Sequence, residues 1–129
     1  MSGGSWGGAA KVYTASREMY EQVTQACPEV FSRMVDAFHM AVAIGIKEGK
    51  SKTFKREGPE ILNMYSVDPD DVLGPLLCEL FPDKSATERY ESLLELAEYG
   101  IERIHQEILQ TATFDPTAYM SYGPSGEGS

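Results

Sequence analysis

The sequence predicts an all-α protein, a single-domain bundle of four to five helices. Apolar residues recur at helical spacing, capping residues precede these segments, and only Val12–Thr14 and Lys52–Phe54 show any tendency to pair briefly as strands. The 129 residues suffice for one domain with its own core. We place the helical domain at residues 12–112, between flexible, disordered tails at 1–11 and 113–129 that are rich in Gly, Ser, Thr and Pro.

Two helices are expected in the N-terminal half of the domain. Ser16 can cap the first, over residues 16–27. Pro28 suits the first turn of the second, which is the most apolar segment and is expected to be the central helix. Gly49 suits the left-handed position just past a helix end, so we predict that the second helix stops there.

A short helical segment and a further helix are expected next. Residues 60–66 predict one or two helical turns. Asp68 can cap a helix that begins at Pro69, although Gly74–Pro75 predicts either a kink or a later start. The buried side of this helix is expected to consist of Val72, Leu73, Leu76, Leu77, Leu80 and Phe81.

The last helix has the clearest start signal. Ser85 and Glu88 have the spacing of a capping box, in which each side chain bonds the backbone N–H of the other residue. The helix is predicted to reach Gln110. Its apolar seam alternates steps of four and three residues and consists of Tyr90, Leu94, Ala97, Ile101, Ile104 and Ile108.

Composition limits the class of protein. The chain carries 11 Lys and Arg against 20 Asp and Glu, a formal net charge of −9, which argues against a general coat for nucleic acid. No apolar run is long enough for a membrane helix and no signal peptide is evident, so we expect a cytoplasmic protein without membrane contact. Cys27 and Cys78 are expected to be buried, reduced thiols.

Catalytic and metal-binding motifs give little support for an enzyme. Nucleophile, phosphate-loop and zinc motifs are absent. Glu102 and His105 have the spacing of di-iron carboxylate bundles, and Asp36 and His39 repeat it, but these residues flank the apolar seams. We therefore expect no catalytic residue, no metal and no cofactor, and keep a metal-dependent helical-bundle enzyme as a remote alternative.

The most informative feature is a run of basic residues in positions 47–56, which holds five of the eleven cations and only one acid. A solvated loop is one interpretation, and a loop that contacts phosphates is the other, since several cations together give weak, salt-sensitive binding to nucleic acid. Phe54 could stack on a base or anchor the loop. The candidate nucleic-acid-binding residues are Lys47, Lys50, Lys52, Lys55 and Arg56.

A row of glutamates at helical spacing lies along one face of the last predicted helix. Like charges three and four residues apart destabilise a helix slightly unless they are solvated or paired. The row is therefore either a solvated acidic face or a docking surface for a basic partner, including the protein's own basic loop. These candidate partner-binding residues are Glu88, Glu91, Glu95, Glu98 and Glu102.

Several short motifs occur in a characteristic order. They are Asp36-Ala37-Phe38, Ala41-Val42-Ala43-Ile44-Gly45, the basic turn Lys47-Glu48-Gly49-Lys50, Ile61-Leu62 and Leu96-Ala97-Glu98-Tyr99-Gly100-Ile101. Over about residues 30–109 this order resembles small helical proteins associated with DNA phosphorothioation (Dnd-type) islands in prokaryotes. The resemblance implies an accessory role in DNA modification or phage defence, and it implies no catalytic residues.

Two functional hypotheses follow. The first is a non-enzymatic accessory subunit of a prokaryotic DNA-modification or phage-defence system, which contacts nucleic acid through the loop 47–56 and protein partners through helical faces. The second is a protein–protein adaptor or oligomerisation module without nucleic-acid binding, in which the basic loop of one copy meets the acidic helix of another. Both imply a protein partner or a homo-oligomer.

Overall fold

The computed structural model describes residues 6, 8–9, 11–55 and 60–117. Over these residues the protein is mainly helical, as predicted, and it also contains a small two-stranded sheet. The elements in chain order are β1 (Lys11–Tyr13), α1 (Arg17–Ala26), α2 (Met34–Glu48), β2 (Glu60–Asn63), α3 (Met64–Val67), α4 (Leu73–Leu80) and α5 (Ala86–Thr111).

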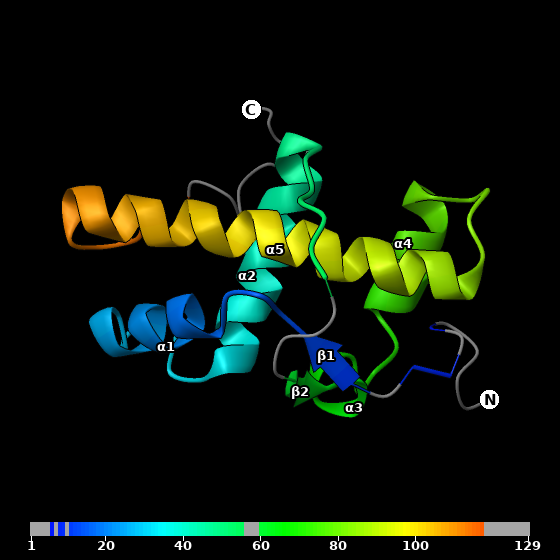
Figure 1. Ribbon diagram of the computed structural model, residues 1–129, viewed down its shortest axis with the longest axis horizontal. Coiled ribbons are helices and arrows are strands. Elements are labelled where there is room, and N and C mark those ends of the chain that lie inside the picture. Colours follow the sequence, from blue (N-terminus) through cyan, green and yellow to red (C-terminus); the bar gives the residue numbers. More distant parts are fainter. Residues whose placement is uncertain (1–5, 7, 10, 56–59, 118–129) are drawn as a thin grey trace.

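The long helix α5 organises the molecule, and α2 crosses it steeply near its middle (Figure 1). Small residues allow the two backbones to approach closely. A Cβ added at Gly100 would stand 1.9 Å from the carbonyl oxygen of Ala41, and one at Gly45 would stand 2.8 Å from that of Leu96. This crossing forms the centre of the core, because the apolar faces of both helices are buried there.

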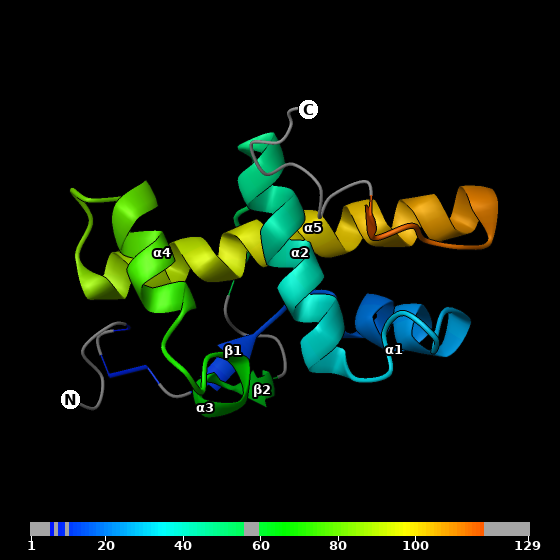
Figure 2. The ribbon, with the colours of Figure 1, turned by 180° about the vertical axis from the view of Figure 1, so that it is seen from behind.

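The remaining elements pack around this crossing. Helix α1 lies along the C-terminal half of α5 and buries Tyr20 and Val23, whereas α4 lies beside its N-terminal half (Figures 1 and 2). Seen from behind, α2 and α4 both lie on the near side of α5 (Figure 2). The two ends of α5 therefore carry different neighbours, which matters for the surfaces described below.

The sheet corrects the prediction for residues 60–66. Strands β1 and β2 are antiparallel, with Val12 opposite Leu62, and an irregularity follows Val12. Val12 is fully buried against the core, which fits the preference of β-branched residues for half-buried strands. Only the turn α3, from Met64 to Val67, is helical in the segment expected to form one or two helical turns.

Helix α2 begins later than predicted. Pro28 does not start the helix, because the N–H groups of Val30 and Phe31 both donate to the carbonyl oxygen of Cys27 and close a turn there. The helix begins at Met34 instead, where the Asp36 carboxylate accepts the backbone N–H of Arg33 at 3.2 Å and the guanidinium of Arg33 at 3.0 Å. Its end agrees with the prediction, since Gly49 has a φ of +66° and its N–H donates to the last turn.

Helix α4 has the later start that Gly74–Pro75 allowed. It begins at Leu73 because the carboxylate of Asp68 accepts the N–H groups of Val72, Leu73 and Gly74 at 2.7, 3.0 and 3.1 Å. Pro75 then lies in the first turn, where a missing N–H costs no intrahelical bond.

Helix α5 starts as predicted. The Ser85 hydroxyl accepts the N–H of Glu88 at 3.1 Å, and the Glu88 carboxylate accepts the N–H of Ser85 at 2.8 Å. The helix ends at Thr111, one residue beyond the predicted end.

Two residues within the tails predicted to be flexible, and one cysteine, differ from expectation. Trp6 and Phe114 are buried, and the Phe114 ring lies 5.3 Å from that of Phe31. Cys27 is buried as expected, whereas Cys78 is exposed on α4. The predicted flexibility of residues 1–5, 7, 10 and 118–129 lies outside the described residues.

Candidate interaction surfaces

The basic run begins in the last turn of α2 and continues along the segment that follows it. Lys47, Lys50, Lys52 and Lys55 are all exposed, and Arg56 lies outside the described residues. The left-handed turn at Gly49 redirects the chain, and the N–H of Lys50 donates to the carbonyl oxygen of Gly45 at 3.0 Å.

This segment passes over α5 and meets the predicted glutamate row within the same molecule (Figure 1). The backbone N–H of Lys52 donates to the carbonyl oxygen of Glu95 at 3.0 Å, and the Lys52 ammonium pairs with the Glu102 carboxylate. That pairing raises the pKa of Lys52. Phe54 is half-buried against Glu91 and Leu94, which fits its interpretation as an anchor for the segment.

Glu98 is buried, although its spacing predicted that it would lie with the other glutamates on one face. Its Oε1 accepts the Thr14 hydroxyl at 2.7 Å and its Oε2 accepts the Ser16 hydroxyl at 2.6 Å. Ser16 therefore stands at the N-cap position of α1 without making a side-chain capping bond. Burial, together with the nearby Glu98 carboxylate, raises the pKa of the Tyr20 phenol well above its ordinary value.

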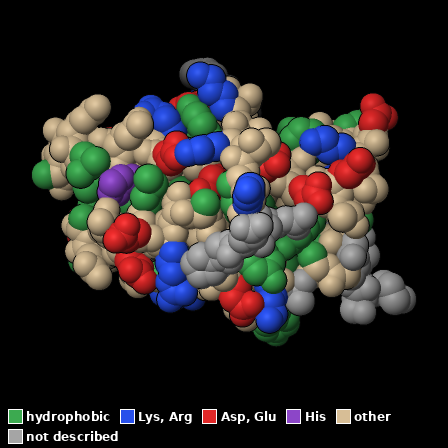
Figure 3. Space-filling view, viewed as in Figure 1, with side chains coloured by type: hydrophobic (Ala, Val, Ile, Leu, Met, Phe, Trp, Pro, Cys, Tyr) green, Lys and Arg blue, Asp and Glu red, His purple; other side chains and the backbone are tan. Residues whose placement is uncertain are grey.

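The remaining glutamates of the row have separate roles. Glu88 is part of the capping box, Glu102 pairs with Lys52, and Glu91 and Glu95 are half-buried beside the basic segment. Lys and Arg side chains are interspersed with Asp and Glu on this face (Figure 3). The predicted anion-binding segment and the predicted acidic surface therefore partly neutralise each other.

A second candidate surface consists of exposed apolar residues rather than of paired charges. At the N-cap of α4 and along the helix, Val72, Leu76 and Leu80 are exposed by 66%, 37% and 42%, whereas Leu77 is fully buried. These three exposed residues are four positions apart, so they form one stripe on the helix, which we term the α4 ridge. The prediction that they belong to the buried side was wrong.

Two hollows flank the α4 ridge. At the start of α4, a hollow of about 300 Å³ is lined by His39, Val67 and Val72, with Asp70 at its edge. At the end of α4, a hollow of about 250 Å³ is lined by Leu80 and other apolar residues, with Lys50 among its lining. The other lining residues of the second hollow are Gly45, Ile46, Gly49, Ser51, Phe81 and Leu96.

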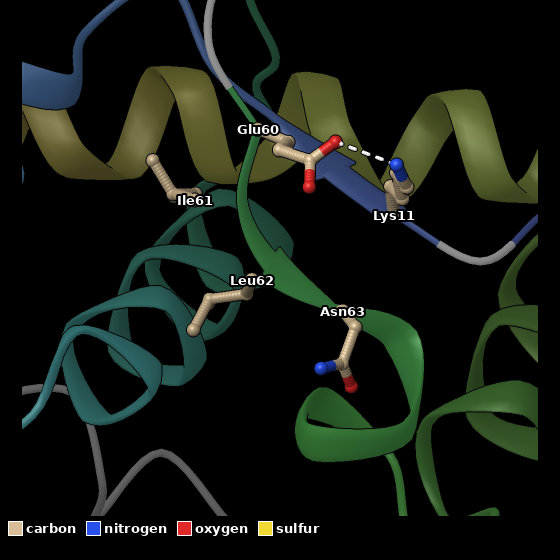
Figure 4. Close-up of a pocket in the computed structure, with 5 residues that line it drawn as sticks. All are labelled: Lys11, Glu60, Ile61, Leu62 and Asn63. Carbon is tan, nitrogen blue, oxygen red and sulfur yellow. Dashed lines mark ion pairs between the residues drawn. The ribbon is translucent and has the colours of Figure 1, made fainter.

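A third hollow, of about 450 Å³, is open and lies beside the sheet (Figure 4). Lys11 and Glu60 form an ion pair across it at 3.0 Å, which raises the pKa of Lys11. The Asn63 side chain accepts the N–H of Ser66 at 2.8 Å. Because Lys11 and Glu60 pair with each other and Asn63 bonds Ser66, this hollow offers little to a charged ligand.

The residues considered for a metal site are engaged elsewhere. The Nε2 atom of His39 lies 2.7 Å from the carbonyl oxygen of Val67, and that of His105 lies 2.6 Å from the side-chain oxygen of Gln22. Within the described part of the chain, His, Cys, Asp and Glu form no group of three or more that could hold a metal ion. In the same part of the chain, no helix has the length and apolar character needed to span a membrane.

Comparisons with known proteins found no similarity: no family model matches the chain, and no curated protein or solved structure matches it significantly.

Proposed function

We propose that the protein is a non-enzymatic protein–protein adaptor that docks a partner through the α4 ridge. The observation that supports this is the exposure of Val72, Leu76 and Leu80 on one stripe of a short helix. Apolar patches that stay exposed on soluble proteins are typical of interaction sites. The hollows at both ends of the helix provide space for side chains of the partner.

The charged surfaces favour the adaptor hypothesis over a hypothesis in which positive charge attracts an anionic partner. The pairing of Lys52 with Glu102, and the glutamates next to the basic segment, reduce the positive potential available to an anion. A partner that depends on apolar contact is unaffected by this neutralisation.

Site-specific photo-cross-linking in cells that produce the protein tests this proposal. A photoreactive amino acid at position 76 is expected to give a discrete protein adduct, whereas the same residue at the exposed position Gln25 of α1 gives none. Leu80→Asp in the same chain is expected to abolish the adduct. Equal labelling from positions 76 and 25, or labelling that survives Leu80→Asp, would contradict docking through the α4 ridge.

A nucleic-acid contact is the second candidate, because Lys47, Lys50 and Lys55 are exposed on one continuous segment. In this version the protein is an accessory subunit of a prokaryotic DNA-modification or phage-defence system, the context that the Dnd-type resemblance implies. Three phosphate contacts would give weak affinity with a shallow dependence on salt.

DNA mobility shifts across a salt series test the second candidate. Lys50→Glu with Lys55→Glu is expected to remove binding, whereas Arg17→Glu on α1 is expected to leave it unchanged. Absence of binding in the unmodified protein at low salt, or equal loss in both variants, would exclude this contact.

A further inference from the structure

The α4 ridge is symmetric in its apolar pattern and asymmetric in its charge. Leu76 lies at its centre, and Val72 and Leu80 each lie about 6 Å away along the helix axis. The two hollows differ in charge: Asp68 and Asp70 line the first, and Lys50 lines the second. Lys84 adds a cation at the second end, where its ammonium donates to the Ser92 hydroxyl at 2.6 Å and lies 4.5 Å from the centre of the Phe81 ring.

We propose that the α4 ridge docks a second copy of this chain, with the two α4 helices antiparallel and Leu76 at the twofold axis. This inference rests on the proposed adaptor function and specifies the partner. A twofold contact brings the same patch of both copies together, so the patch must be complementary to itself. Antiparallel packing places Val72 against the partner's Leu80 and Asp70 near the partner's Lys50.

Charge complementarity favours a second copy in this orientation. Asp68, Asp70 and Asp71 precede α4 with no Lys or Arg near them in sequence, whereas Lys84 accompanies Glu79 and Asp83 at the far end of the helix. A parallel arrangement would place Asp70 against the partner's Asp70, and like charges in contact oppose association. The antiparallel arrangement places that acidic end against the end where Lys50 and Lys84 balance Glu79 and Asp83.

Sedimentation velocity on the purified full chain, from about 1 μM to about 500 μM, tests the proposal. The unmodified protein is expected to shift from monomer to dimer over this range. Leu76→Asp is expected to remain monomeric with an unchanged circular dichroism spectrum, because its side chain is already partly exposed. A cross-link from position 76 is expected to join two copies.

A charge exchange makes the test specific for the antiparallel arrangement. Asp70→Lys alone and Lys50→Glu alone are each expected to weaken dimerisation about tenfold, because symmetry repeats the repulsive contact at both ends. An equimolar mixture of the two variants is expected to recover the original affinity, since each contact then joins opposite charges. Glu18→Lys and Lys55→Glu are matched controls on other surfaces and are expected to have no effect.

Several results would overturn the proposal. They are a monomer at every concentration, a dimer that Leu76→Asp leaves intact, a mixture no tighter than the single variants, and a position-76 cross-link within one chain. A monomer whose position 76 cross-links to a different protein would overturn the second copy as partner while leaving the adaptor function standing. A protein that neither dimerises nor forms any cross-link from position 76 would contradict both the second copy as partner and the adaptor function.

Discussion

Gly100 of α5 lies directly against the backbone of Ala41 in α2, where a Cβ would stand 1.9 Å from the carbonyl oxygen of Ala41. No L side chain fits at that distance without a shift of backbone. The steep crossing of the two longest helices therefore depends on the absence of a side chain at this position, as it does at Gly45.

Gly100→Ala is expected to destabilise the protein by about 2–3 kcal/mol, because two packed helices must separate. In an exposed helix interior the same substitution would stabilise by about 1 kcal/mol, so the sign of the change is diagnostic. Urea unfolding followed by circular dichroism measures it, with Gln106→Ala on the exposed side of α5 as the control. A stabilised Gly100→Ala protein would show that the helices do not cross this closely.

Glu98→Ala is expected to cost about 3 kcal/mol, since it leaves the buried hydroxyl of Thr14 and that of Ser16 without their acceptor. Thr14→Val is expected to cost about 1–2 kcal/mol. The double variant should lose about 1 kcal/mol less than the sum, because one bond is removed in both single variants. Strict additivity in urea unfolding would contradict a direct bond between the two side chains.

Stability is expected to fall at alkaline pH because of Tyr20. Its pKa is raised in the folded protein above the ordinary value of 10.0, chiefly by burial. As the pH rises above that ordinary value, the unfolded chain loses the phenolic proton while the folded chain keeps it, so the unfolded state is favoured. The contribution of the Tyr20 phenol to the free energy of unfolding is therefore complete below about pH 10 and is lost progressively above it.

Urea unfolding at a series of pH values measures this dependence. Tyr20→Phe is expected to reduce the alkaline slope, and the slope that remains includes Tyr99, whose pKa is raised by its hydrogen bond to Glu48. An unchanged slope in Tyr20→Phe would show that this phenol does not control alkaline stability.

Asp68→Ala is expected to cost about 1–2 kcal/mol, because three N–H groups at the start of α4 lose their acceptor. Asp68→Asn should cost less, since its amide oxygen can still accept. Hydrogen exchange at the first turn of α4 should rise in the Ala variant. Asp83→Ala, an exposed acid beyond the helix, is the control, and an equal effect there would argue against capping.

The ion pair between Lys52 and Glu102 is expected to contribute less than about 1 kcal/mol, because both side chains are partly solvated. A double-mutant cycle with Lys52→Met and Glu102→Gln measures the coupling, which should decrease as salt is added. A coupling that is large and independent of salt would indicate a far more buried pair.

Local patterns were sufficient where local bonds decide the structure. The capping box of Ser85 and Glu88 and the left-handed Gly49 were both correctly predicted, because each bond joins residues a few positions apart. The later start of α4 was one of two alternatives left open by Gly74–Pro75.

Predictions failed where distant segments decide the structure. Strand β2 pairs with β1, about fifty residues earlier, so residues 60–63 are extended despite their expected helical turns. Glu98 has the spacing of the other glutamates in the row, but its carboxylate is buried and accepts hydroxyls from Thr14 and Ser16. No periodicity within α5 contains that information.

The α4 ridge was missed for a different reason. Six apolar residues in positions 72–81 are more than one side of a short helix can bury, yet all were assigned to the buried side. The excess was itself a signal of an exposed apolar surface. One contact agrees with an alternative that the sequence leaves open, in which the acidic helix binds the protein's own basic loop, since Lys52 pairs with Glu102.

Helix α5 also determines when the chain can fold during its synthesis. It supplies the packing surface for both α1 and α2 and the carboxylate that the Thr14 and Ser16 hydroxyls need, although it follows them in the chain. A nascent chain that still lacks α5 exposes the apolar faces of both earlier helices on the ribosome. We therefore expect these helices to need protection from aggregation until residues 86–111 have emerged.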